Sequence, residues 1–139
     1  MRAAAAKRVR HSGDPVLIEG YASLFGVADN SGDVVRAGAF ARSLKYGGVP
    51  MLLQHRSGAV AGRWVRMVED GRGLYVRGLV EGRKVRSLVD EGLDGLSIGF
   101  RPRVWTPRGE RGRTLADVDL VEVSLVAEPM LSTARFRVV

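Results

Sequence analysis

Short apolar segments separated by glycine-containing turns recur along the whole chain. Several of them alternate apolar and polar residues, which is the period of two that a half-buried β-strand requires. Two stretches, around residues 39–44 and 85–89, instead place apolar residues at helical spacing. Because no regular strand–helix alternation and no repeat of about 20 to 50 residues is visible, the pattern argues against a parallel α/β fold and a solenoid. It predicts a mostly β domain with two or three short helices, in the α+β class.

The predicted strands comprise two single strands and two hairpins. A first strand covers residues 15–25, and residues 51–53 form a short buried strand that leads directly into Gln54 and His55. Each hairpin turns through glycine, and the paired segments are residues 60–68 with 74–80 and residues 96–105 with 115–126. The buried strand before His55 therefore delivers polar residues at its end, where a functional site can form.

The composition limits the chemistry open to this chain. Its 139 residues, 45% of them hydrophobic, fit one domain over residues 15–139, preceded by a flexible basic arm over residues 1–14. The absence of cysteine excludes disulfides, thiolate zinc sites and cysteine nucleophiles, and two histidines leave little for a metal centre. The loop at residues 29–33 lacks the glycine and glutamate spacing of a calcium-binding loop. No metal or cofactor is therefore expected. No membrane span is expected either, because no apolar run approaches roughly 20 residues.

The charge balance leaves a second class of function open. The chain has 22 basic and 15 acidic side chains, a net charge of +7, which favours contact with phosphates or acidic surfaces. Five arginines surround Trp105 in the second hairpin: Arg101, Arg103, Arg108, Arg111 and Arg113. The alternative hypothesis is therefore a small basic nucleic-acid-binding β-domain. Only 6% of the residues are aromatic, which is few for base stacking, so the hairpin is equally a solvated edge or a surface for an acidic partner.

The most specific local motif surrounds Ser97, which has Gly95 and Gly99 two residues to either side. This G-x-S-x-G pattern marks the nucleophile of α/β-hydrolases, in which an acid and then a histidine follow the serine. Here no histidine follows Ser97 and the strand–helix alternation of that fold is missing. The hydrolase fold is thus excluded, while Ser97 remains a candidate nucleophile.

A serine nucleophile needs a base, and the base needs a third group that orients it. His55 follows a buried strand, whereas His11 lies in the basic arm, so His55 is the candidate base. Strand alternation places Glu122 on one face with Leu120, where an unpaired carboxylate would be costly and one facing a histidine would be compensated. Glu122 is therefore preferred as the third group among the acidic residues of that strand, which are Asp117, Asp119 and Glu122.

Several motifs occur together in one order, over about residues 18–129: Gly20–Phe25, Asp29–Val35, Gly38–Phe40 with Ser43-Leu44, Gln54-His55, Gly95–Phe100 and Val118–Val126 followed by Pro129. In this order they resemble the prohead maturation proteases of tailed phages, including related proteins of gene transfer agents. The resemblance implies a serine endopeptidase with a herpesvirus-protease-like fold, a closed or partly closed β-barrel ringed by helices. The catalytic histidine, nucleophile and acidic residue of the family fall on His55, Ser97 and Glu122.

The resemblance also implies partners and a place of action. The substrates would be the major capsid protein and its scaffold segment, cleaved inside the assembling procapsid in the cytoplasm of a bacterial host. Self-association is open, a membrane is not involved and nucleic acid is not required. Two positions depart from the family, Leu53 where tryptophan is frequent and Arg56 where aspartate is frequent. An arginine beside the base would disfavour the imidazolium formed during attack, which predicts slower activity or a shifted pH dependence. A catalytically inactive capsid-assembly factor that retains the fold is a further alternative.

Overall fold

Residues 14–139 are described by a computed structural model. Its strands are β1 (Val16–Leu24), β2 (Val34–Val35), β3 (Pro50–Leu53), β4 (Val60–Glu69), β5 (Gly73–Val80), β6 (Gly95–Arg108), β7 (Gly112–Val126) and β8 (Phe136–Val138). Its helices are α2 (Ala41–Leu44) and α3 (Arg83–Asp90). The mostly β fold with short helices is confirmed, whereas the predicted basic arm lies outside the described residues except for Asp14.

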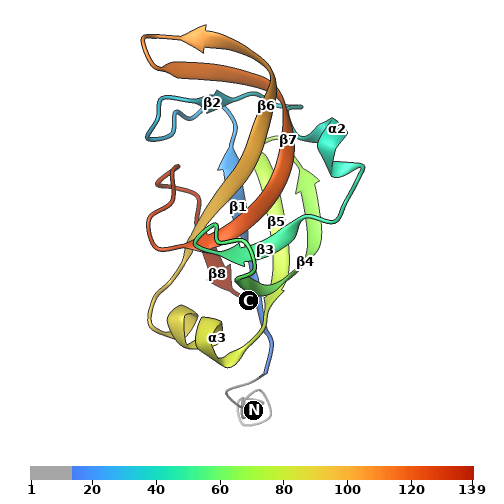
Figure 1. The fold of residues 1–139 in the computed structure, drawn as a ribbon, viewed down its shortest axis with the longest axis vertical. Coiled ribbons are helices and arrows are strands. Elements are labelled where there is room, and N and C mark those ends of the chain that lie inside the picture. Colours follow the sequence, from blue (N-terminus) through green and yellow to red (C-terminus); the bar gives the residue numbers. More distant parts are fainter. Residues whose placement is uncertain (1–13) are drawn as a thin grey trace, which may run out of the picture.

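The strands of the described part form one sheet in the order β2-β7-β3-β4-β5-β1-β8, with β6 paired to β7 (Figure 1). The β3–β7 pair is parallel, and the β6–β7, β3–β4, β4–β5, β1–β5 and β1–β8 pairs are antiparallel. Between the start of β6 and the segment before β8 there is only a single bridge, from Gly95 to Arg135. The ladders therefore do not close the sheet into a barrel.

The core is built from the alternate residues of these strands. Ile18, Met51, Val76 and Leu125 are each fully buried in one hydrophobic cluster. Helix α3 adds Val85 and Val89, whose spacing of four residues places them on one face. Helix α2 is a single turn that begins at Ala41, because residues 37–40 form a turn rather than helix, and it is followed by Gly47 and Gly48 with positive φ angles of 64° and 70°. None of the helices in residues 14–139 has the length and apolarity needed to cross a membrane.

A β-bulge at Val121 reverses the side-chain alternation of β7. Gly99 pairs with Glu122, but the next residue of β6, Phe100, pairs with Leu120, so Val121 is the extra residue. Because neighbouring residues of β6 point to opposite faces, Leu120 lies on the core face and Glu122 on the other. The expectation that Leu120 and Glu122 share a face is wrong, since simple alternation does not reveal a bulge.

The far ends of β6 and β7 project beyond the rest of the sheet as a two-stranded arm (Figure 1). Residues 101–111 of this arm are exposed. At its base the Arg113 guanidinium donates to Asp33 at 2.7 Å, which raises the pKa of Arg113. Asp29 in turn accepts backbone N–H groups of Ser31 and Asp33 at 2.9 and 3.0 Å, so this loop is held by its own carboxylates.

The guanidinium of Arg42 ties α2 to β7. Its Nε donates to Oδ2 of Asp117 at 3.1 Å, and its Nη2 donates to Oδ1 of Asp119 at 2.5 Å. The hydrogen bond from Arg42 is the main cause that lowers the pKa of Asp119 below its ordinary value. Both carboxylates are therefore engaged on the α2 side of β7.

We expect acid to weaken this connection. Because the folded-state pKa of Asp119 is lowered, its contribution to stability is present above the unfolded pKa of about 3.9 and is lost as the pH falls through the folded value. Between about pH 6 and about pH 3, the urea midpoint should fall less in Arg42→Gln than in the wild-type protein. The control is Arg63→Gln, which removes an exposed guanidinium 3.8 Å from Glu81. Parallel curves for Arg42→Gln and the wild type would contradict the expectation.

Candidate active site

His55 follows β3 in a strained turn that is held against the end of β7. Gln54 and His55 have φ angles of 54° and 60°, a left-handed conformation that residues other than glycine rarely adopt. The N–H of Gln54 donates to the Leu125 carbonyl at 2.9 Å, and the N–H of His55 donates to Oγ of Ser124 at 3.0 Å. The Gln54 side chain accepts the N–H of Ala127 at 3.3 Å. These contacts turn the chain back so that the His55 side chain lies over β7.

The imidazole of His55 contacts one carboxylate. Its Nδ1 lies 2.5 Å from Oε2 of Glu122, and because a carboxylate only accepts, Nδ1 carries the proton of this hydrogen bond. The Glu122 side chain is 10% exposed and the His55 side chain 42%, so the carboxylate is enclosed and the ring is accessible. An enclosed carboxylate without such a partner would be costly. The pair thus has the geometry of an oriented base whose Nε2 is available for a proton.

Ser97 lies on the same face of the sheet as this pair. In the β6–β7 ladder Ser97 is opposite Ser124, and Gly99 is opposite Glu122. Directly opposed residues of antiparallel strands project to the same face. Within residues 14–139 no hydrogen bond joins Ser97 to His55, and catalytic hydrogen bonds are often long before substrate binds. The structure thus brings His55 and Glu122 into contact, and it places Ser97 on their face without a direct bond.

Ser124 contacts both members of the pair, and it is not among the site residues predicted from the sequence. Its hydroxyl donates to Oε1 of Glu122 at 2.6 Å and accepts the N–H of His55. Ser124 is fully buried and its proton is engaged, so it is not available as a nucleophile. A signal was present in the sequence, because a serine two residues after Glu122 in an otherwise apolar segment shares the face of that carboxylate.

The two glycines near Ser97, Gly95 and Gly99, lie where groups of β7 come very close to the β6 backbone. A Cβ added to Gly95 would lie 2.4 Å from the Val126 carbonyl oxygen. A Cβ added to Gly99 would lie 2.1 Å from Oε2 and 2.8 Å from Cδ of Glu122. Each glycine therefore leaves room for a group on β7, and the G-x-S-x-G pattern here serves the packing of two strands.

Gly99→Ala is expected to displace Glu122 from His55. The added methyl group would overlap the carboxylate, so the side chain must turn away, at a stability cost of about 1–3 kcal/mol. On the predicted assignment of His55 as base and Glu122 as its orienting group, reaction with a serine-directed fluorophosphonate should then slow by about 10- to 100-fold. The control is Gly71→Ala, where an added Cβ meets nothing within 4 Å. Equal labelling rates for the two variants would contradict this account.

The other candidate residues lie elsewhere. Asp117 and Asp119 are engaged by Arg42, away from His55. Arg56, which departs from the family pattern, is exposed, and its N–H closes the turn by donating to the Leu53 carbonyl at 3.1 Å. Its guanidinium makes no hydrogen bond or ion pair among the described residues, so it does not compete for Glu122. Residues 14–139 contain no group of three or more metal-ligating side chains.

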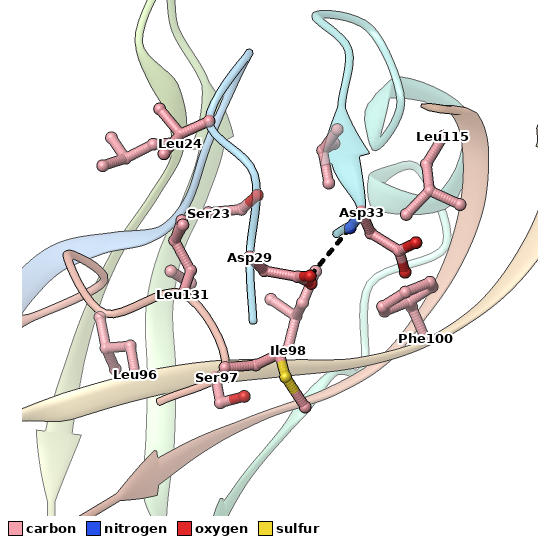
Figure 2. A pocket seen from close by; sticks show the side chains of 14 residues that line it. Ser23, Leu24, Asp29, Asp33, Leu96, Ser97, Ile98, Phe100, Leu115 and Leu131 are labelled. Atoms are coloured by element: carbon pink, nitrogen blue, oxygen red, sulfur yellow. Dashed lines mark hydrogen bonds between the residues drawn. The ribbon is translucent and has the colours of Figure 1, made fainter. Parts of the chain in front are cut away.

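A small cavity lies on the opposite side of β6 from this pair. Its volume is about 30 Å³, room for one water molecule rather than for a peptide. Figure 2 shows Asp29 and Asp33 above β6, with the Ser97 hydroxyl directed away from them. The cavity is therefore too small to hold a peptide, and chemistry at Ser97 would take place on the face that carries His55.

Comparison with known proteins points to one family. The family described as caudovirus prohead serine protease matches residues 4–139. The prohead protease of Enterobacteria phage HK97 is 36% identical over 93 residues, which cover 60% of this chain and 41% of that protein. This chain thus spans about two fifths of that relative.

Two solved structures share the fold. The protease of KSHV, solved with a hexapeptide phosphonate inhibitor, has a TM-score of 0.63 at 12% identity, covering 91% of this chain and 65% of that one. The capsid assembly protease of bacteriophage T4 has a TM-score of 0.63 at 18% identity, covering 82% of this chain and 87% of that one. The predicted resemblance to phage prohead proteases and the herpesvirus-protease-like fold are therefore confirmed.

Proposed function

The chain belongs to the caudovirus prohead serine protease family, and we propose that it is a serine endopeptidase with Ser97 as nucleophile, His55 as base and Glu122 as orienting carboxylate. The contact between Nδ1 of His55 and Oε2 of Glu122 is the observation that carries this proposal. Ser97 on the same face supplies the remaining group that acyl transfer requires.

In this mechanism Glu122 holds the Nδ1 proton and so keeps Nε2 unprotonated. As the Ser97 oxygen bonds to the carbonyl carbon of the scissile peptide, Nε2 accepts the hydroxyl proton. The imidazolium that forms is stabilised by the Glu122 carboxylate, and it then returns the proton to the leaving amine as the peptide bond breaks. Water next attacks the acyl-enzyme with His55 again as base, which releases the acid and restores Ser97. General-base assistance of this kind contributes about 10²- to 10⁴-fold.

The proposed substrates are capsid and scaffold polypeptides, cleaved inside the assembling procapsid in the host cytoplasm. This part of the proposal is supported by the family description and by the relatives named as a prohead protease and a capsid assembly protease.

We also propose that the fold is a partly closed barrel, in which the Gly95–Arg135 bridge joins β6 to the β8 side of the sheet. Two backbone hydrogen bonds beside this bridge support the proposal. The N–H of Leu96 donates to the Ala134 carbonyl at 2.9 Å, and the N–H of Phe136 donates to the Asp94 carbonyl at 2.8 Å.

Two measurements test the proposed activity. A fluorophosphonate probe should attach covalently to Ser97, and peptide mass spectrometry identifies the modified residue among all serines of the chain. Incubation with the capsid precursor of the same particle should produce a new capsid N-terminus, detected by intact-mass measurement. Attachment at another serine, or a capsid precursor of unchanged mass, would contradict the proposal.

A further inference from the structure

Ser124 connects the two ends of the His55–Glu122 pair. The backbone N–H of His55 donates to its Oγ at 3.0 Å, and the hydroxyl proton goes to Oε1 of Glu122 at 2.6 Å. The other carboxylate oxygen, Oε2, receives Nδ1 of the same His55. The three residues thus form a closed ring of hydrogen bonds that runs from the backbone of His55 through Ser124 and Glu122 to its own imidazole.

This ring has a fixed direction. A hydroxyl has one proton, so once the Ser124 proton is given to Oε1, its lone pairs are left to accept the N–H of His55. Oε1 is then occupied, and Oε2 alone faces the imidazole. Ser124 is fully buried, so water does not compete for these contacts.

The same hydroxyl supports an unfavourable backbone. Gln54 and His55 both have left-handed φ angles, a conformation that persists only where the surroundings hold it. The hydrogen bond to Ser124 is the side-chain contact that holds the His55 peptide in this turn. Without it the turn can relax, and the imidazole moves with it.

From these contacts we propose that Ser124 is a positioning residue, which sets both the place of the His55 backbone and the orientation of the Glu122 carboxylate. The proposal rests on the proposed function, because it assigns the pair a catalytic task. The orientation of the His55 imidazole can nevertheless be measured without catalysis.

The test compares Ser124→Ala with Ser43→Ala. Ser43 is a matched control, since it is also a buried serine whose Oγ accepts a backbone N–H, that of Leu120 at 2.8 Å, but it lies away from His55. The rate of fluorophosphonate attachment to Ser97 should fall by about 10- to 100-fold in Ser124→Ala and stay at the wild-type value in Ser43→Ala. In protein with ¹⁵N-labelled histidine, the downfield Nδ1–H resonance of His55 should broaden or vanish only in Ser124→Ala.

The outcomes distinguish the positioning role of Ser124 from the proposed endopeptidase function. Wild-type labelling and an unchanged Nδ1–H resonance in Ser124→Ala overturn the positioning role, as does an equal loss of labelling in Ser43→Ala. If the wild-type protein itself does not react with the probe, the proposed function fails, and the resonance alone decides the role of Ser124. Should Ser124→Ala not fold, Ser124→Cys, with a thiol of similar size and weak hydrogen bonding, is measured in its place.

Discussion

The Ser97→Ala protein is expected to fold like the wild type and to lose cleavage of the capsid precursor by about 10⁴- to 10⁶-fold. The substitution removes one oxygen from a residue that is 5% exposed and forms no side-chain hydrogen bond among the described residues, so packing changes little. The reaction, in contrast, loses the atom that would bond to the scissile carbonyl. Circular dichroism and thermal melting check the fold, and intact-mass measurement follows cleavage over time.

A matched control for this variant is Ser43→Ala, which removes a buried hydroxyl from α2. It should lower the melting temperature more than Ser97→Ala does, because it leaves the N–H of Leu120 without its acceptor. Its cleavage rate should nevertheless stay at the wild-type value. Undiminished cleavage by the Ser97→Ala protein would remove Ser97 from the mechanism.

Glu122→Gln should reduce cleavage by about 10³- to 10⁴-fold with little change in shape. The Ser124 hydroxyl donates to Oε1, so the glutamine carbonyl oxygen takes that position and the amide NH₂ faces His55. An NH₂ group donates to Nδ1, which shifts the imidazole proton to Nε2. A ring protonated at Nε2 no longer accepts a proton from Ser97, and the base is lost although the ring keeps its place.

The comparison for Glu122→Gln is Asp119→Asn, three residues away on β7. It also neutralises a carboxylate, but one that binds Arg42 and Arg103 at 2.5 and 3.4 Å rather than His55. Asp119→Asn should cleave at the wild-type rate. Two-dimensional NMR of ¹⁵N-labelled histidine measures which ring nitrogen carries the proton in each variant. A proton that stays on Nδ1 in Glu122→Gln would argue against the orienting role.

The fold class was predictable because its signals are local. Alternating apolar residues and glycine turns give strands and hairpins, and the observed β4–β5 and β6–β7 pairs lie where the sequence places them. His55 was predictable as a candidate base for the same reason, since it follows a short buried strand. The preference for Glu122 rests on simple strand alternation, which puts it on the same face as Leu120. The bulge at Val121 places these two residues on opposite faces, so that expectation is wrong.

The remaining features of the site depend on contacts between distant segments. The left-handed turn at Gln54 and His55 is stabilised by β7, about 70 residues further along the chain, so no local pattern encodes it. Likewise, the need for glycine at position 99 comes from the Glu122 side chain on the neighbouring strand.

By itself the sequence determined the strands, the glycine turns, the candidate nucleophile and, through its ordered motifs, the protease family to which the chain belongs. These follow from side-chain period, backbone freedom and residue chemistry, which act over a few residues. Only the tertiary structure decided that Ser124 joins His55 to Glu122, and that one extra residue in β7 turns that carboxylate away from the core. Hydrogen bonds and strand register depend on atoms brought within about 3 Å by folding, and that proximity is a property of the packed sheet rather than of any segment.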